Sequence, residues 1–139
     1  MWDWLTAWFR RPVGDAGRWG EACAERHLRD KGYRILGRRV RVGRRDELDL
    51  VAADGAVLVF VEVKTRAGED FGRPAAAVNR AKRHHVSRAA ARYLKNLPRR
   101  PDHFRFDVVE VIGREEAGAP VVRHIENAFT LAAPYRLSW

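Results

Sequence analysis

The chain of 139 residues contains a single cysteine, Cys23, and no long uninterrupted hydrophobic segment. One cysteine excludes internal disulfide bonds and any cysteine-rich zinc site, and it fits a reducing cytoplasm. The apolar stretches are far too short for a membrane-spanning helix, and the first residues lack the positively charged start of a signal peptide. The sequence therefore predicts a cytoplasmic protein without an integral membrane segment.

Acidic residues are scarce relative to basic ones: 18 Asp and Glu stand against 27 Lys and Arg, for a formal net charge of +9. Such an excess is typical of proteins that bind a polyanion. Nucleic acid is the leading candidate, although a generally arginine-rich proteome would produce the same excess. The sequence also lacks a glycine-rich phosphate loop, a serine–histidine triad and a zinc motif, so none of these chemistries competes.

Residues 46–66 contain two runs of β-branched and alternating residues on either side of the turn signal Asp54-Gly55. This pattern predicts a β-hairpin. An even-length loop centred on Asp54-Gly55 pairs Leu50 with Val59. The rest of the register, and with it the face on which each side chain lies, follows from that pair.

Side-chain alternation assigns the residues of this hairpin to two faces. The face that we expect to be buried is apolar throughout and comprises Leu48, Leu50, Ala52, Val57, Val59, Val61 and Val63. The opposite face is apolar near the turn and carries, at its far end, Glu47, Asp49, Glu62 and Lys64. The predicted register places Leu48 opposite Val61 and Glu47 opposite Glu62. Asp49 is then a diagonal neighbour of Glu62, about 7–8 Å away at the backbone.

Asp49 and Glu62 can converge on one cation from these positions. Oxygen ligands on a rigid strand pair suit Mg²⁺ or Mn²⁺, and Mg²⁺ binds through one or two carboxylates and keeps waters that a phosphate can displace. Lys64, on the same face, is then placed to hold or activate the attacking water. A surface salt bridge among Glu47, Glu62 and Lys64 is the alternative interpretation. The apolar run 57–63 favours the metal site, because ionisable groups on a buried central strand need a reason to be there.

The order Asp49, then Glu62-Val63-Lys64 after a short hairpin, resembles the Asp…Glu-x-Lys signature of restriction-endonuclease-like nucleases. The run Glu-Leu-Asp-Leu-Val followed by Val-Phe-Val-Glu-Val-Lys-Thr-Arg more closely resembles the YraN family of small bacterial proteins. These proteins are themselves similar to archaeal Holliday-junction resolvases. The resemblance covers about residues 18–129 and implies a restriction-endonuclease-like α/β fold, with a mixed central β-sheet flanked by α-helices.

The same resemblance implies roles for further residues. Gly20-Glu21 matches the opening motif of the family, so we expect Glu21 near the active site as an outer ligand or a water-orienting group. The carbonyl of Val63 would join the two carboxylates as a metal ligand. Lys82 matches a lysine of the family, and we expect either a phosphate contact or a side chain that extends to solvent.

Arginines crowd the stretch before the carboxylates, where they would track a phosphate backbone or form a solvated loop; they are Arg38, Arg39, Arg41, Arg44 and Arg45. The nucleic-acid contacts that we predict are Arg41, Arg44, Arg45, Arg66 and Lys82. The YraN family usually has an asparagine near position 39 or 40 and a glycine before the counterpart of Glu47. This chain has Arg39, Val40 and Asp46 there, which leaves the conformation of the loop open.

Helical periodicity predicts helices over 18–31 and about 75–97, and alternation predicts strands over 33–42, 104–112 and 121–125. Asp107 in the fourth strand is also a feature of the family, but buried structural hydrogen bonding is its preferred role. The resulting organisation is an aromatic N-terminal segment with a linker (1–17), a nuclease-like domain (18–129) and a C-terminal tail (130–139).

We therefore expect a Mg²⁺- or Mn²⁺-dependent endonuclease that hydrolyses phosphodiester bonds of DNA, with branched DNA as one candidate substrate. The alternative is a nucleic-acid-binding or adaptor protein that keeps the fold without turnover. A third hypothesis is a protein-interaction module working through the tryptophan-rich residues 1–13, whose spacing indicates a short amphipathic helix. That segment would pack on its own domain or contact a partner, and a homodimer is left open.

Overall fold

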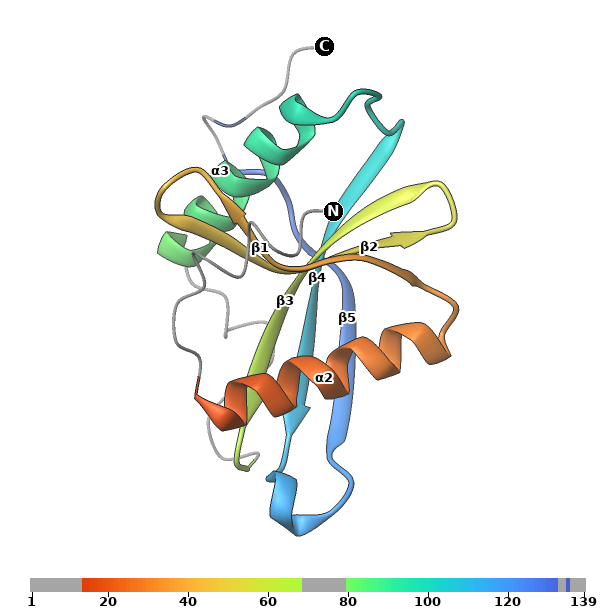
Figure 1. Cartoon of the computed structure of the whole chain (residues 1–139), viewed down its shortest axis with the longest axis vertical. Helices are drawn as coiled ribbons and strands as arrows, with labels where there is room; N and C mark the ends of the chain where they lie inside the picture. The colour runs from red at the N-terminus through yellow and green to blue at the C-terminus, as the bar shows by residue number, and fades with distance from the viewer. Residues whose placement is uncertain (1–13, 69–79, 133–134, 136–139) are drawn as a thin grey trace.

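The structure, a computed structural model, describes residues 14–68, 80–132 and 135. The aromatic segment 1–13, the first residues of the helix expected from about 75 and most of the predicted tail lie outside these ranges. The described elements are α2 (Asp15–Asp30), β1 (Arg34–Val42), β2 (Asp46–Asp54), β3 (Val57–Arg66), α3 (Arg80–Asn96), β4 (His103–Ile112), the short 3₁₀ helix η2 (Glu115–Ala117) and β5 (Val121–Phe129) (Figure 1).

The strands form one five-stranded sheet in the order β1-β2-β3-β4-β5. β3 and β4 run parallel and are connected through α3, whereas the other neighbours are antiparallel. The sheet is therefore mixed, and α2 and α3 flank it (Figure 1). This architecture confirms the predicted α/β class and is consistent with a restriction-endonuclease-like fold.

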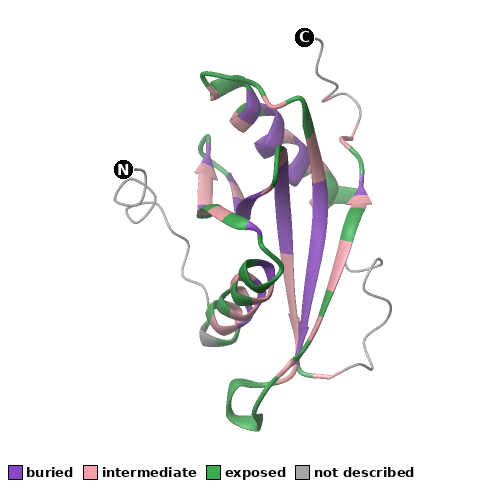
Figure 2. Ribbon diagram, turned by 90° about the vertical axis from the view of Figure 1, so that its right-hand side faces the viewer, coloured by how far each residue is buried: buried purple, intermediate pink, exposed green. Residues whose placement is uncertain are grey.

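Side-chain alternation divides the core into two clusters, one under each helix. The α2 cluster includes Ala24, Leu28, Leu50, Ala52, Val59, Val61, Val109 and Val111. The α3 cluster includes Val51, Phe60, Val86, Ala90, Leu94, Phe106 and Val108. β3 contributes apolar side chains to both clusters, as expected of a central strand covered on two faces. Figure 2 shows the buried residues concentrated in the middle of the sheet and on the sides of the helices that face it.

The register of the β2–β3 hairpin differs from the predicted one by two residues. Leu50 pairs with Val61 rather than with Val59, and Asp54 pairs with Val57. Gly55 has a φ of 59°, a conformation that glycine adopts without steric cost, so the two-residue turn is Gly55-Ala56 instead of Asp54-Gly55. Because the error is an even number of residues, the predicted assignment of side chains to faces survives along the paired part of the hairpin.

Leu48 is an exception to the predicted faces. The ladder between β2 and β3 ends at the pair Leu50–Val61, so the predicted pairs of Leu48 with Val61 and of Glu47 with Glu62 do not form. Beyond that point β2 remains paired only with β1 and turns toward α3 (Figure 1). Leu48 consequently packs in the α3 cluster. The two strands thus separate where the acidic residues begin.

The other elements lie close to their predicted positions. α2 begins at Asp15, earlier than expected, and β5 continues to Phe129 rather than ending at 125. An irregularity in the β4–β5 ladder and a φ of 50° at Asn127 interrupt the alternation on which the predicted end of β5 was based. None of the helices in the described ranges is long and apolar enough to cross a membrane.

Candidate active site

Asp49 and Glu62 lie at the gap that opens between β2 and β3. They are the next residues beyond the last pair, Leu50–Val61. A carboxylate oxygen of Asp49 accepts a hydrogen bond from the backbone N–H of Val63 at 2.9 Å. Glu62 is only 4% exposed. One carboxylate from each strand therefore lies directly beyond the last pair, whereas the predicted register placed the two residues on a diagonal.

Glu62 is a buried carboxylate that interacts with a second carboxylate and with two ammonium groups. Burial, and then the charge of Asp49, raises the pKa of Glu62 to about 8. Two cations act in the opposite direction: Lys82, whose Nζ lies 3.2 Å from Glu62 Oε1, and Lys64. Burial lowers the pKa of Lys82, but the charges of Glu62 and Asp49 outweigh this and raise it. The two carboxylates and two ammonium groups thus form one interacting cluster.

Glu21 reaches this region because α2 packs closely on β3. A Cβ atom at Gly20 would overlap the hydroxyl of Thr65, so the helix can sit this close only with glycine at that position. Glu21 Oε2 accepts a hydrogen bond from Arg39 Nε at 2.6 Å. Burial raises the pKa of Glu21, Arg39 opposes the shift, and the charge of Asp49 adds to it. The Gly20-Glu21 pair therefore brings a third carboxylate into the field of the cluster.

Arg39 makes an ion pair beside the acidic cluster that the sequence did not indicate. It was expected to follow a phosphate backbone or to lie in a solvated loop, yet it is buried and bonded to Glu21. Its φ of 44° lies in the left-handed region, where asparagine is enriched among residues with a side chain. The asparagine expected near this position in the YraN family was the available signal, but it pointed to the backbone conformation and not to the ion pair.

The donor set in the gap suits a cation that needs few protein ligands. Within residues 14–68, 80–132 and 135, no group of three or more His, Cys, Asp or Glu side chains is positioned to hold a metal ion. Glu21 is bonded to Arg39, which leaves Asp49 and Glu62 as the pair whose mutual repulsion a cation would relieve. Mg²⁺ can bind through one or two carboxylates with waters completing its octahedron, whereas a closed structural zinc site needs four ligands. The two carboxylates therefore fit Mg²⁺ or a similar hard cation.

The predicted cationic residues occupy three different places. Lys64 and Lys82 belong to the cluster around Glu62. Arg66 Nε lies 3.7 Å from an oxygen of Glu110, a buried carboxylate on β4. The predicted arginines nearest to the carboxylates in sequence lie instead on β1 and on its turn into β2; they are Arg41, Arg44 and Arg45.

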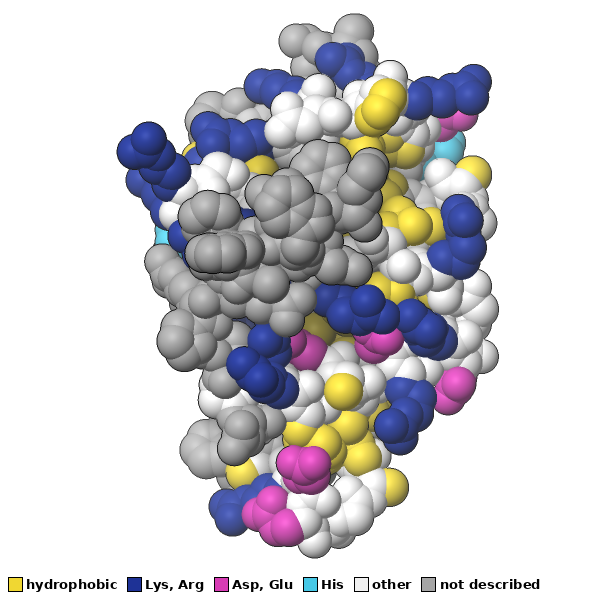
Figure 3. Space-filling view, viewed as in Figure 1, with side chains coloured by type: hydrophobic (Ala, Val, Ile, Leu, Met, Phe, Trp, Pro, Cys, Tyr) yellow, Lys and Arg dark blue, Asp and Glu magenta, His cyan; other side chains and the backbone are white. Residues whose placement is uncertain are grey.

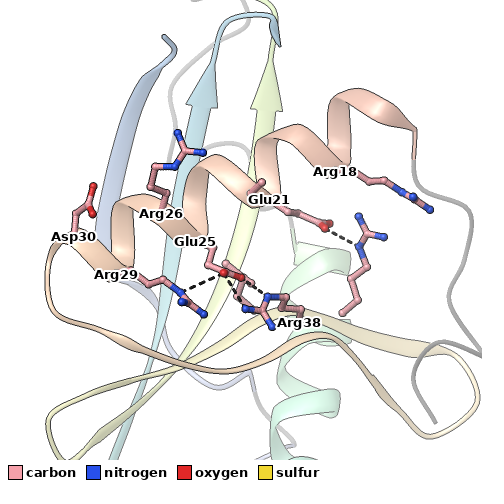
Figure 4. Close-up of a pocket in the computed structure, with 10 residues that line it drawn as sticks. Arg18, Glu21, Glu25, Arg26, Arg29, Asp30 and Arg38 are labelled. Atoms are coloured by element: carbon pink, nitrogen blue, oxygen red, sulfur yellow. Dashed lines mark hydrogen bonds and ion pairs between the residues drawn. The ribbon is translucent and has the colours of Figure 1, made fainter. Parts of the chain in front are cut away.

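A basic hollow of about 590 Å³ lies between α2 and β1, beside Glu21 (Figure 4). Its charged lining comprises five arginines and three carboxylates: Arg18, Arg26, Arg29, Arg38 and Arg39 with Glu21, Glu25 and Asp30. Glu25 partly balances this charge, because Arg29 lies 3.2 Å away and Arg38 donates a hydrogen bond of 2.9 Å. Figure 3 shows Lys and Arg side chains across this face of the molecule with acidic side chains between them. The arginines of α2 were not among the predicted contacts.

Asp107 belongs to a separate polar network on the α2 side of the sheet. It is buried and accepts hydrogen bonds from Arg105 Nε at 3.0 Å and from the backbone N–H of Asn127 at 3.0 Å, and its carboxylate lies 2.7 Å from His124 Nε2. Burial raises its pKa, but the hydrogen bonds outweigh this effect and hold the pKa below its usual value. These contacts agree with the structural role preferred for Asp107.

Comparison with known proteins gives matches that cover the whole of this region. The model of a family described as "Uncharacterised protein family UPF0102" matches residues 20–111, from the Gly20-Glu21 motif to the last residue but one of β4. The UPF0102 protein STH1475 of Symbiobacterium thermophilum is 49% identical over 119 residues, which cover 86% of this chain and 97% of that protein.

Two further relatives show the same extent of similarity. The UPF0102 protein FRAAL5785 of Frankia alni is 49% identical over 113 residues, covering 81% of this chain and 92% of the relative. The UPF0102 protein CT2262 of Chlorobaculum tepidum is 43% identical over 117 residues, covering 81% of this chain and 90% of the relative. The chain therefore belongs to the UPF0102 family, the YraN family that its motifs predicted.

Proposed function

We propose that this protein is a divalent-cation-dependent nuclease that hydrolyses phosphodiester bonds of DNA. The proposal is carried by one observation: Asp49 and Glu62 meet at the gap between β2 and β3, beside Lys64. Burial, and then the charge of Asp49, raises the pKa of Glu62 to about 8, because both disfavour the ionised carboxylate. Carboxylates that repel each other in this way favour a shared cation.

The chain's own groups have distinct roles in the proposed reaction. Water attacks phosphorus, the bond to the leaving oxygen breaks, and that oxygen takes up a proton, so that the products are a phosphate monoester and a hydroxyl. A bound Mg²⁺ or Mn²⁺ would neutralise charge on the phosphate and lower the pKa of water. Asp49, Glu62 and the Val63 carbonyl would hold the ion. Lys64 stabilises charge that develops on the phosphate oxygens, and Glu21 orients the attacking water.

Lys82 links the acidic cluster to the proposed substrate. Its ammonium group lies 3.2 Å from Glu62 Oε1, so it competes with a cation for that oxygen. With a cation bound to Glu62, Lys82 would be able to contact a phosphate of the substrate. Its partly exposed position at the start of α3 suits this exchange.

The nucleic-acid part of the proposal rests on charge. The net charge is +9, and a basic hollow of about 590 Å³ adjoins Glu21. We propose that a nucleic-acid backbone enters along α2 and β1 and reaches the carboxylates there. Contacts further along this surface come from the predicted residues Arg41, Arg44, Arg45, Arg66 and Lys82.

The decisive experiment separates cleavage from binding. Purified protein is incubated with Mg²⁺ or Mn²⁺ and with branched, flapped, single-stranded and duplex DNA and with RNA, and both cleavage and affinity are measured. Lys64→Ala should abolish cleavage and leave affinity within a few-fold, because one ammonium group is a small part of a contact with many phosphates. Lys95→Ala, which removes the same charge from an exposed site at the end of α3, is the matched control and should change neither.

Glu62→Gln tests the cation site in the same assay. The variant should lose cleavage with either cation, and its DNA affinity should stay equal or rise because a negative charge is removed. Both variants must first be shown to be folded by circular dichroism and thermal unfolding. If the wild-type protein binds these substrates but cuts none of them, the adaptor function replaces the nuclease.

A further inference from the structure

A second basic pocket lies at the turn between β1 and β2, where the turn packs against α3. Its volume is about 480 Å³, and it is lined by Arg44, Arg45, Asp46, Arg88 and Arg92. Of these five side chains, four are guanidinium groups and one is a carboxylate. The lining therefore carries a net positive charge.

Asp46 neutralises only one of these arginines. Arg88 donates two hydrogen bonds to it, from Nε to Oδ2 at 2.6 Å and from Nη2 to Oδ1 at 2.7 Å. The hydrogen bonds from Arg88 lower the pKa of Asp46 and outweigh the effect of burial, which raises it. Asp46 is 7% exposed, and both of its oxygens are engaged. Among the residues that line the pocket, no second carboxylate is present to balance Arg44, Arg45 and Arg92.

The pocket is held in shape before any ligand binds. A Cβ atom at Gly43 would overlap the guanidinium group of Arg92, so this group lies directly against the backbone of the turn. Arg41 Nη2 donates a hydrogen bond of 2.6 Å to the carbonyl of Arg44, which fixes the turn from the other side. Arg92 lies one helical turn beyond Arg88 on α3 but, unlike Arg88, has no carboxylate partner among the lining residues. An anion in the pocket would balance its charge.

We propose that this pocket binds a backbone phosphate of the nucleic acid, close to the phosphate that the carboxylate pair contacts. Guanidinium groups bind phosphate through two parallel hydrogen bonds, which favours arginine over lysine at such a site. Asp46 precedes Asp49 by three residues on β2, or about 10 Å along a strand. The pocket and the carboxylate pair are therefore close enough to contact nearby phosphates of the same DNA strand. The pocket thus anchors substrate on one side of the bond to be cut.

The inference rests on the proposed nucleic-acid substrate but does not depend on cleavage. Affinity for a short labelled DNA duplex is measured by fluorescence anisotropy over a series of salt concentrations. Arg92→Gln should weaken binding several-fold and reduce the slope of log K against log salt by about 1, and the double variant Arg44→Gln/Arg45→Gln should reduce it by about 2. Arg114→Gln, an exposed arginine in the β4–β5 connection, is the matched control and should leave the slope unchanged.

Arg92→Lys separates a shaped site from bulk charge. It keeps the charge and loses the planar fork, so it should restore the salt slope and only part of the affinity. An Arg92→Lys protein that binds like the wild type, or an Arg114→Gln protein as weak as Arg92→Gln, would show that only overall charge matters and would overturn the pocket. The altered side chains are exposed, and thermal unfolding verifies that each variant is folded.

Two further comparisons identify the source of the phosphate and separate this inference from the nuclease proposal. The DNA duplex should shift the side-chain NMR signal of Arg92 Nε–H at a far lower concentration than inorganic phosphate does at matched ionic strength. A signal that responds to inorganic phosphate at the lower concentration would indicate a small phosphate ligand and contradict the inference. If the pocket variants lose affinity and the wild type never cuts DNA, the phosphate-binding pocket is supported and the nuclease proposal is wrong. If the wild type cuts DNA and the pocket variants bind and cut it equally well, the proposed phosphate site is wrong and the nuclease proposal is supported.

Discussion

At the scale of the residue, Glu62 combines a carboxylate with a position that is only 4% exposed. Burial and the charge of Asp49 raise its pKa from 4.5 to about 8. Between these pH values the folded protein retains a proton that the unfolded chain has released. The contribution of Glu62 to stability is therefore fully present below about pH 4.5 and is lost as the pH rises through about 8.

This linkage predicts the pH dependence of unfolding in the presence of a chelator. We expect the wild-type Tm, followed by circular dichroism, to contain a decrease from pH 4.5 to about 8 that Glu62→Gln removes. The amide of glutamine does not titrate, so the variant lacks only the contribution of residue 62. All other titrating groups contribute equally to both curves. Wild-type and variant curves that stay parallel over this range would contradict the assigned shift.

Lys82 allows a test of cation binding that does not depend on activity. Because its ammonium group pairs with Glu62, Lys82→Gln should bind Mg²⁺ more tightly than the wild type does. A ligand that binds only the folded state at 100 times its Kd stabilises by about 2.7 kcal/mol, so the increase in Tm with added Mg²⁺ reports the binding. Glu62→Gln should show little increase. The same increase in all three proteins would place the cation elsewhere.

At the scale of the element, the packing of α2 on β3 positions Glu21. Gly20 faces Thr65 so closely that an added Cβ would overlap the threonine side chain. We expect Gly20→Ala to destabilise the protein by about 1–3 kcal/mol, as overpacking of a core contact does. Denaturant unfolding measures this cost.

A second substitution checks that the cost arises from this contact. Thr65→Ala removes the hydroxyl and methyl groups that an alanine at position 20 would meet, so the double variant should recover part of the lost stability. Gly14→Ala, at the N-cap of α2 with open space around the glycine, adds a Cβ without a clash and is the control for the clash itself. Additive effects of Gly20→Ala and Thr65→Ala would contradict the close approach.

At the scale of the whole molecule, the net charge of +9 determines how binding responds to salt. Each neutralised phosphate releases counterions, so we expect affinity for DNA to fall by about 10³–10⁵ between about 50 and 200 mM salt if roughly six to ten phosphates are contacted. A titration of labelled DNA at several salt concentrations measures this slope. Binding that is absent at low salt, or indifferent to salt, would remove nucleic acid as the partner.

The sequence alone determined the features that depend on local periodicity. Alternation in β3 predicted a central strand, and an even-length turn was enough to place the apolar side chains of the paired region on the correct face. The order Asp49, Glu62, Lys64, with Gly20-Glu21 upstream, identified the family that the comparisons then showed. These features could be predicted because each depends on neighbours in the chain or on a short motif.

The tertiary structure decided every contact between segments that are distant in the sequence. The hairpin register depends on which residue of the turn has a positive φ, and that residue is Gly55. Leu48 packs in the α3 cluster because β2 turns toward α3. The ion pairs of Arg39 with Glu21 and of Arg88 with Asp46 likewise join elements whose separation in the chain carries no periodic signal. Such pairs form because a buried charge requires a partner, and only the folded chain determines which partner lies within reach.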